Sequence, residues 1–459
     1  MKIGLFIFPV RFASMPPIDI AYLSAYLKKR GHEVYIRDFN VEIRVENDCD
    51  TRFWSQLINQ QDLFNKNKVM IEKWVEDILA FSPDYIGISV WETELYFSQE
   101  IAKMIKNRRK DTKIIFGGPW CSFSSGRNMI QNEYVDYAVF GEGEFTLAEI
   151  IESQGSQNPI PGCLMKVDGK ILDGGWREET INPDLFPYPD YSSFDFNKYL
   201  YTSTYPILFN RGCNWNCSFC THRTAWHNFR SRSAENIFAE IQHCFSTYPW
   251  IKRFYSCDHS INSNMKQVLE VCDFIITHGV QIEAFIGFGQ VNPQMLKEDV
   301  IKKLKQADFK EWGIGVQTGS DRILKSMRRP YTAAQAEQML EIMHKYDIRP
   351  AIDFIIGYPE ETEDDFRKTL EFISRICKYV TNISVAPSCY IGNNDLWFHP
   401  ERYGICALKG GGESWESPTS TPAIRLKRYQ IMMAHLSHLG ISHRYSDEDR
   451  KFAEDKMNS

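Results

Sequence analysis

Three cysteines stand within one short stretch of the sequence, RGCNWNCSFC, at positions 213, 217 and 220. Their C-x3-C-x2-C spacing is tighter and more regular than the burial of small apolar residues requires, and no fourth cysteine follows nearby. Thiolates are soft ligands that favour zinc or iron–sulfur clusters. Three thiolates on one loop can hold three corners of a cubane and leave the fourth iron open. Cys213, Cys217 and Cys220 therefore predict a [4Fe–4S] cluster with one vacant coordination position.

A structural zinc ion is the alternative occupant of this loop. Zinc usually takes four ligands, and His222 and His227 lie close enough in the sequence to complete a Cys3His set. The x3–x2 spacing is not that of a zinc knuckle, so the cluster is favoured. The other nine cysteines are scattered singly, which is typical of free thiols in a reducing compartment.

The elements around the triplet predict where it lies in the fold. From Pro206 onward, helical segments separate six short apolar strands. We expect these strands at residues 205–210, 251–257, 281–287, 311–316, 351–357 and 382–388. Six such βα units over residues 206–390 are typical of a partial (β/α)6 barrel of the TIM type. The cysteines follow the first strand, at the end of the barrel where active sites are built.

The first 150 residues also alternate strand and helix signals. Five apolar strands, with helical patterns between them, indicate an α/β fold with a doubly wound, Rossmann-like parallel sheet covered on both faces. Residues 151–205 read as a linker that contains a hairpin turning at Asp168–Gly169 and a proline-rich strap. Residues 391–459 are expected to form a small C-terminal segment that caps the substrate, with a last helix near residues 424–439.

Composition excludes several classes of protein. A formal charge of -6 over 459 residues, with no basic run, argues against a nucleic-acid partner. No apolar stretch approaches the roughly 18 residues of a membrane span. Arg11 interrupts the N-terminal apolar run early, so that run reads as a strand rather than a signal peptide. We therefore expect a cytoplasmic protein.

Several longer stretches extend the pattern beyond the triplet. GVQTGSDRILKSM (315–327) and IIGYPEETEDDF (355–366) are similar to the G-x-E-S-G-S-x-x-x-L and G-x-P-G-E-T segments of the radical S-adenosylmethionine (SAM) superfamily. PPIDIAYLSAYLKKRGHEVYIRD (16–38), FGGP (116–119) and VDYAVFGEGEFTLAEI (135–150) resemble the cobalamin-binding domain of one branch. The chain thus resembles the radical SAM enzymes that carry a cobalamin-binding domain, over about residues 1–390.

The resemblance implies a set of cofactor contacts in the barrel. Each of the three cysteines would ligate one iron, and SAM would bind the fourth. An electron, delivered by a flavodoxin- or ferredoxin-type donor, would cleave SAM to a 5′-deoxyadenosyl radical. SAM contacts are expected at Phe219, Asp258, Gln317 and Ser320. Asp258 and Ser320 also read as helix N-terminal residues, and Gln317 replaces the usual glutamate of the family.

Cobalamin, in the resembling branch, commonly binds without a histidine ligand. The chain has no D-x-H-x-x-G motif, and His32 is the only histidine among its first 200 residues. Parallel sheets bind ligands at the C-terminal ends of their strands. That rule selects as cobalamin contacts Trp91, Gly117, Gly118, Trp120, Glu142 and Gly143.

The leading functional hypothesis is cobalamin-dependent methyl transfer to an unactivated carbon of a small-molecule or natural-product substrate. A radical SAM rearrangement or cyclisation, with cobalamin in another role or absent, remains an alternative. A non-catalytic iron–sulfur redox sensor is the alternative from another class. Methylthio transfer to tRNA is set aside because that branch carries three further N-terminal cysteines, whereas only Cys49 and Cys121 precede Cys163 here.

Overall fold

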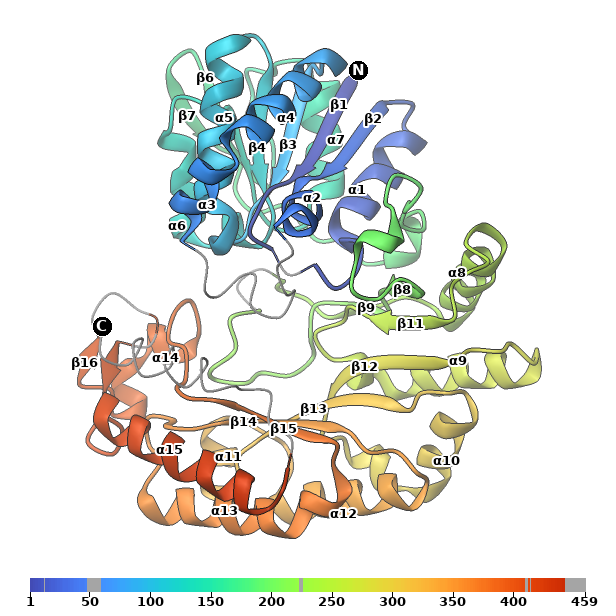
Figure 1. Cartoon of the computed structure of the whole chain (residues 1–459), viewed down its shortest axis with the longest axis vertical. Coiled ribbons are helices and arrows are strands. Elements are labelled where there is room, and N and C mark those ends of the chain that lie inside the picture. Colours follow the sequence, from blue (N-terminus) through green and yellow to red (C-terminus); the bar gives the residue numbers. More distant parts are fainter. Residues whose placement is uncertain (12, 48–58, 223–225, 409–411, 413, 442–459) are drawn as a thin grey trace. The chain divides into compact units, whose positions relative to one another are not determined.

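The computed structural model describes residues 1–459 except 12, 48–58, 223–225, 409–411, 413 and 442–459. The chain forms two compact units (Figure 1). The first comprises Met1–Pro206 together with two short segments from later in the chain, Ala225–His227 and Tyr248–Ile251. The second comprises the remaining residues. No helix of the described residues is long and apolar enough to cross a membrane.

A seven-stranded sheet, in the order β2-β1-β3-β4-β5-β6-β7, forms the centre of the first unit. Its strands are β1 (Lys2–Ile7), β2 (Glu33–Asp38), β3 (Tyr85–Ser89), β4 (Lys113–Gly117), β5 (Tyr137–Val139), β6 (Cys163–Val167) and β7 (Lys170–Asp173). The first five pair in parallel, which confirms the expected doubly wound sheet. The hairpin expected within residues 151–205 forms β6 and β7 and extends this sheet antiparallel.

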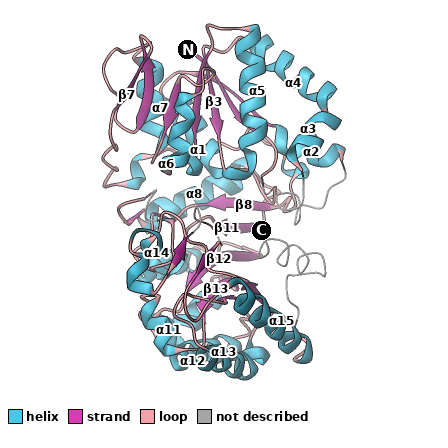
Figure 2. Cartoon of the chain, turned by 90° about the vertical axis from the view of Figure 1, so that its left-hand side faces the viewer, coloured by secondary structure: helices cyan, strands magenta, loops and turns pink. Residues whose placement is uncertain are grey.

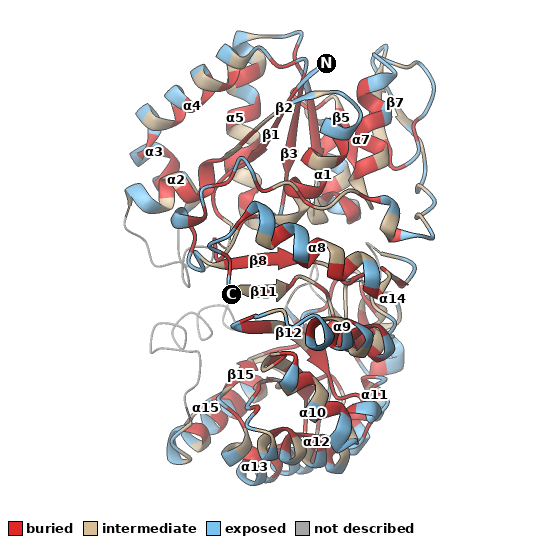
Figure 3. Ribbon diagram, turned by 90° about the vertical axis from the view of Figure 1, so that its right-hand side faces the viewer, coloured by how far each residue is buried: buried red, intermediate tan, exposed pale blue. Residues whose placement is uncertain are grey.

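Helices cover both faces of this sheet, with α1 and α7 on one side and α4 and α5 on the other (Figure 2). The helices are α1 (Ile18–Lys29), α2 (Phe39–Glu46), α3 (Gln60–Lys66), α4 (Lys68–Phe81), α5 (Leu95–Arg108), α6 (Ser124–Arg127) and α7 (Gly143–Glu152). Because neither face meets water, β1 and β3 are buried almost throughout (Figure 3).

A six-stranded sheet, in the order β15-β14-β13-β12-β11-β8, forms the second unit. Its strands are β8 (Thr204–Ile207), β11 (Arg253–Ser256), β12 (Ala284–Gln290), β13 (Glu311–Gln317), β14 (Ala351–Ile355) and β15 (Asn382–Ala386). All six strands expected from the sequence are present, and β11 to β15 pair in parallel. The sheet is thus the partial barrel that was predicted.

Helices follow the strands along the outside of this sheet (Figure 1). They are α8 (Ala234–Thr247), α9 (Met265–Thr277), α10 (Glu298–Gln306), α11 (Asp321–Ser326), α12 (Ala333–Lys345) and α13 (Glu363–Ile376). The C-terminal segment adds α14 (Asp395–Phe398), β16 (Ala407–Leu408), β17 (Trp415–Glu416) and α15 (Pro422–His438). The end of the expected capping segment, residues 442–459, lies outside the described residues.

Candidate active site

The three cysteines lie on a long loop whose base is a two-stranded ribbon. The ribbon pairs β9 (Asn210–Arg211) with β10 (Arg230–Ser231), and we call the described residues between them, 212–222 and 226–229, the cysteine loop. Gly212 opens the loop at φ +78°, and a Cβ there would lie 2.4 Å from the backbone oxygen of Asn228. Only glycine fits this position, so the residue before Cys213 is set by the turn into the loop.

Two of the three thiols, Cys213 and Cys220, are made weaker acids by burial. Burial raises the pKa of Cys213, and it raises the pKa of Cys220 to about 11, with further increases from the other two cysteine thiols. Three soft sulfur donors on one loop fit a [4Fe–4S] cluster.

The alternative of a single zinc ion finds less support in the side chains. In the described part of the chain, no three His, Cys, Asp or Glu side chains converge on one metal-ion position. Cluster ligands that each bind a different iron need no such convergence. His222, one of the two histidines that could have completed a zinc site, stacks on His259 with ring centroids 3.8 Å apart.

Arg329 is the main residue absent from the sequence-based candidates, because an arginine that follows a helix is usually solvated. It is 7% exposed, and its Nη1 donates to Cys217 Sγ at 3.1 Å and to Gln290 Oε1 at 2.5 Å. Its Nη2 donates to the carbonyl of Gly315. A Cβ on Gly315 would lie 3.2 Å from that Nη2, so the glycine makes room for the guanidinium. The only local signal was this glycine within a strand pattern.

Phe219 and Gln317, two of the expected SAM contacts, lie beside this arginine. The Arg329 guanidinium stands 5.9 Å from the centroid of the Phe219 ring. Gln317 has φ +78°, where β13 shifts register against β14, and its Nε2 would be 2.5 Å from a Cβ on Gly315. The structure therefore brings both side chains to the cysteine site.

Asp258 and Ser320, the other two expected SAM contacts, make hydrogen bonds within the protein. The Asp258 carboxylate accepts from the backbone N–H groups of Phe209 at 3.0 Å and Asn210 at 2.5 Å, and from Ser256 Oγ. Burial raises the pKa of Asp258 to about 6. Ser320 Oγ donates to an Asp365 oxygen at 2.6 Å. Asp258 thus holds the chain where it enters the β9 strand and the cysteine loop.

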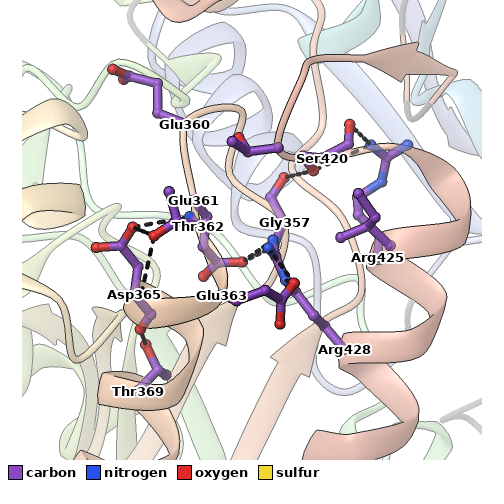
Figure 4. Close-up of polar contacts among 12 residues, drawn as sticks. Gly357, Glu360, Glu361, Thr362, Glu363, Asp365, Thr369, Ser420, Arg425 and Arg428 are labelled. Carbon is purple, nitrogen blue, oxygen red and sulfur yellow. Dashed lines mark hydrogen bonds and ion pairs between the residues drawn. The ribbon is translucent and has the colours of Figure 1, made fainter.

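The stretch 355–366 anchors the C-terminal segment (Figure 4). Gly357, at φ +69°, donates its N–H to Glu361 Oε2 at 2.8 Å, and Arg428 of α15 donates to the same oxygen at 3.1 Å. Burial raises the pKa of Glu361 to about 7, although Arg428 opposes the shift. Arg425, one turn before Arg428, stacks over Trp415 at 4.2 Å. These contacts fix α15 to the end of β14.

In the first unit, the order β2-β1-β3 places the point where the strand order reverses between β1 and β3, and such points bind ligands. Trp91 follows β3 and is 43% exposed, with the Arg11 guanidinium 5.8 Å from its ring. Arg11 pairs with Asp19 at 3.0 Å and with Glu94 at 3.6 Å. Ser89, the last residue of β3, also donates to Asp19. Burial raises the pKa of Glu94 to about 8.

The remaining expected cobalamin contacts follow β4 and β5. Gly118 has φ +91°, and a Cβ there would lie 2.8 Å from the Val90 nitrogen, so close backbone contact explains this glycine. Glu142 and Gly143 stand at the N-terminus of α7. Trp120 Nε1 is buried and has no hydrogen-bond partner among the described residues. A free donor at this edge fits the amide side chains of a corrin ring.

Two sequence models of known families match the chain. The B12 binding domain matches residues 7–151, and the radical SAM superfamily matches residues 207–373. The uncharacterized methyltransferase PH0819 of Pyrococcus horikoshii is 26% identical over 90% of this chain and 84% of its own length. The anaerobic magnesium-protoporphyrin IX monomethyl ester cyclase of Cereibacter sphaeroides is 22% identical over 78% of this chain and 56% of its own length.

Two solved structures share the fold over most of the chain. The cobalamin-dependent SAM radical enzyme OxsB, solved with aqua-cobalamin and SAM, aligns with a TM-score of 0.73 and 17% identity over 94% of this chain and 66% of its own. The radical SAM methyltransferase TsrM from Kitasatospora setae aligns with a TM-score of 0.67 and 15% identity over 89% and 79%. The two family models imply a [4Fe–4S] cluster, SAM and cobalamin as cofactors. The chain belongs to the radical SAM enzymes that carry a cobalamin-binding domain.

Proposed function

We propose that this radical SAM enzyme is a cobalamin-dependent C-methyltransferase, which acts on an unactivated carbon of a small-molecule or natural-product substrate. The observation that carries the proposal is the extent of the match to the Pyrococcus horikoshii relative, whose name is that of a methyltransferase. That match covers 90% of the chain and so includes both units. A match confined to the six-stranded unit would have supported radical chemistry alone.

The side chains of the second unit have assigned roles in this proposal. When bound, the cluster, SAM and cobalamin together supply the electron, the radical and the methyl group. Cys213, Cys217 and Cys220 hold the cluster, and Arg329 donates a hydrogen bond to the sulfur of Cys217. Phe219, whose ring lies beside the Arg329 guanidinium, would help to shield the cluster from water, and Gln317 would offer an amide to the ribose hydroxyls of SAM.

In the first unit, the loops after β3, β4 and β5 form the proposed cobalamin edge. Trp91 would pack against the bound corrin, and Trp120 would donate a hydrogen bond to it. Gly117 and Gly118 let the backbone approach the ring, while Glu142 and Gly143 meet the ligand at the start of α7. A flavodoxin- or ferredoxin-type protein is the proposed electron donor, and no nucleic-acid partner is proposed.

Cyclisation is the second candidate reaction, because several relatives carry a cyclase name. The Cereibacter sphaeroides cyclase matches 78% of this chain, which again includes parts of both units. A cyclase would consume SAM only as a radical source, whereas a methyltransferase would also consume it as a methyl donor. The two reactions therefore differ in their co-products even before the substrate is known.

The test uses the full chain, reconstituted anaerobically with iron, sulfide and a corrinoid. With SAM carrying a labelled methyl group and a strong reductant, a methyltransferase forms both 5′-deoxyadenosine and S-adenosylhomocysteine, and the second product requires the corrinoid. Deoxyadenosine without S-adenosylhomocysteine would refute methyl transfer and leave cyclisation. Cys220→Ala should abolish both products, whereas Cys244→Ala, at a buried position in α8, should not. A loaded cluster without either product would refute the enzymatic proposal.

A further inference from the structure

The two residues between the second and third cysteine ligands, Ser218 and Phe219, have backbone groups that must be satisfied inside the protein. Cys220 N–H donates to Cys217 O at 3.2 Å, so Ser218 and Phe219 occupy the middle of a tight turn. Ser218 is fully buried. Buried carbonyl groups are nearly always hydrogen-bonded, so the acceptors of this turn require donors from elsewhere in the chain.

Those donors come from the C-terminal segment, about 175 residues later. The backbone N–H of Asp395 donates to Ser218 O at 3.1 Å. The side-chain amide of Asn394 donates to Phe219 O at 2.9 Å. Asn394 is 3% exposed, and the same amide nitrogen also donates to Tyr390 O at 2.9 Å. Each of the two carbonyls thus receives a hydrogen bond from one of two adjacent residues.

Both donors are held in place by further contacts. Asn394 caps α14, because its Oδ1 accepts from Trp397 N–H at 3.1 Å. The Asp395 carboxylate accepts from Arg328 at 2.5 Å and from Tyr403 at 2.5 Å. The pair is therefore rigid before any cofactor binds, which lowers the entropic cost of fixing the turn.

We propose that Asn394 and Asp395 are positioning residues that latch the Cys217–Cys220 turn and so hold two of the three cluster ligands in register. This inference rests on the proposed function in one respect only, namely that the three cysteines bind a cluster. Residues 391–405 then have a second role beside any contact with substrate. They determine how tightly the cluster is retained and how its ligand sulfurs are oriented.

Arg329 contacts the same turn at a different group. Arg329 contacts the ligand sulfur itself, whereas the latch contacts only the peptide carbonyls behind the sulfurs. Ser218 has a third anchor, since its N–H donates to Met327 O at 3.2 Å and its Oγ lies 2.9 Å from the Tyr358 hydroxyl. Removing the latch should therefore loosen the turn without unfolding the loop.

The sharpest test compares Asp395→Pro with Asp395→Ala in the full chain. Asp395 is the first residue of α14, where proline is well tolerated, and Asn394 has the extended backbone (ψ 178°) that a following proline requires. Both variants lose the carboxylate, but only proline loses the N–H donated to Ser218 O. The difference between them therefore reports the loss of this hydrogen bond together with the displacement of Ser218 O by the proline ring.

The measurement is the rate at which the anaerobically reconstituted cluster loses iron to a chelator, together with the EPR spectrum of the reduced cluster. A buried carbonyl left without a donor should make Asp395→Pro lose iron about tenfold faster than Asp395→Ala. The EPR signal of the proline variant should also shift, which a purely global loss of stability would not cause. Equal rates and equal spectra in the two variants would overturn the latch.

A second pair guards against misfolding of the proline variant. Asn394→Asp keeps the acceptor that caps α14 but loses the amide donated to Phe219 O, and it should also release iron faster than wild type. Asn59→Asp is the matched control, since Asn59 caps α3 through its oxygen alone and is exposed. An Asn394→Asp variant that retains iron like Asn59→Asp would refute the role of Asn394.

Wild type provides a measurement that needs no variant. Loading the cluster should slow hydrogen exchange at the Asp395 amide, because the turn it contacts becomes rigid. Unchanged exchange would contradict the coupling. A wild-type chain that takes up no iron or sulfide would instead refute the cluster on which the proposed function rests. The two failures are thus distinguishable.

Discussion

Replacing Asp258 with asparagine tests whether this carboxylate positions the cysteine loop or contacts SAM. The change preserves size and leaves one oxygen, but it replaces the other oxygen with an NH2 group. In the structure, one carboxylate oxygen accepts from Asn210 N–H, and the other accepts from Phe209 N–H and Ser256 Oγ. Whichever way the amide turns, its NH2 faces at least one backbone N–H donor.

The expected magnitude follows from these contacts. An N–H left without an acceptor in a buried site costs about 1–3 kcal/mol, and Asp258 is 7% exposed. The loss falls at Phe209 or Asn210, three or four residues before Cys213. About 2 kcal/mol corresponds to roughly a thirtyfold shift in the equilibrium between the ordered and the displaced loop entry.

The assay measures iron and sulfide per chain after reconstitution and, separately, the dissociation constant of SAM for the loaded fraction. A positioning role predicts a smaller loaded fraction and faster iron loss, with the SAM dissociation constant close to wild type in molecules that retain the cluster. Asp273→Asn, on the exposed face of α9, is the control. Full cluster loading together with a dissociation constant for SAM at least tenfold higher than wild type would refute the positioning role. Asp258 would then be a residue that contacts SAM.

Three further predictions concern charged groups. Arg329→Gln should lower the midpoint potential of the cluster by roughly 60 mV, because a cation that donates to the Cys217 sulfur favours the reduced state. A redox titration followed by EPR measures this potential. The control variant Arg367→Gln, at an exposed position, should leave it unchanged. Burial raises the pKa of Glu94 to about 8, above its ordinary 4.5, so the folded state must release a proton that the unfolded state has already lost. The free energy of unfolding of wild type should therefore fall by about 3 kcal/mol between about pH 5.5 and 8.5, whereas that of Glu94→Gln should not. The same pH dependence of unfolding in both proteins would contradict this. Arg428→Met should destabilise the second unit by about 3 kcal/mol in thermal or denaturant unfolding, because Glu361 loses its buried partner. Adding Glu361→Gln to the same chain should restore most of this stability. A double variant that is no more stable than Arg428→Met would argue against the pairing.

The sheets were predictable from the sequence because their strands are short runs rich in apolar residues separated by helical patterns, and β1 and β3 of the first sheet are buried almost throughout. Helix α2 was not predicted, although it directly follows β2. Its apolar residues Val41, Ile43 and Val45 alternate with polar ones, which is the period of a strand. The Asp38 side chain accepts from Val41 N–H and caps the helix. The cap therefore favours a helix here although the alternating pattern is that of a strand.

The cysteine triplet was predictable because cluster ligation imposes a spacing within one loop. The groups that contact this loop follow no spacing rule. Arg329 reaches Cys217 from 112 residues away, and Asn394 reaches Phe219 from 175 residues away. Such contacts are set by tertiary packing, and a single sequence carries no signal that pairs these positions. The same limit explains why Asp258 could be read equally as a ligand contact or a framework residue.

The candidate cofactor contacts differ in whether their polar atoms already make hydrogen bonds within the protein. Asp258 accepts three hydrogen bonds from the protein and Ser320 donates its hydroxyl proton to Asp365, so both side chains already have protein partners. Trp120 Nε1 and Asp19 Oδ1, by contrast, are buried and have no hydrogen-bond partner among the described residues. An unpaired buried polar atom costs free energy that a ligand can recover, and both atoms belong to the unit that matches the B12 binding domain. Trp120 is therefore a stronger candidate for contacting cobalamin than Gly118, whose conformation is already explained by its contact with Val90. Trp120→Phe, which removes only the N–H donor, should weaken corrinoid binding about tenfold in equilibrium dialysis, whereas the same affinity in Trp120→Phe and wild type would show that the donor is not used.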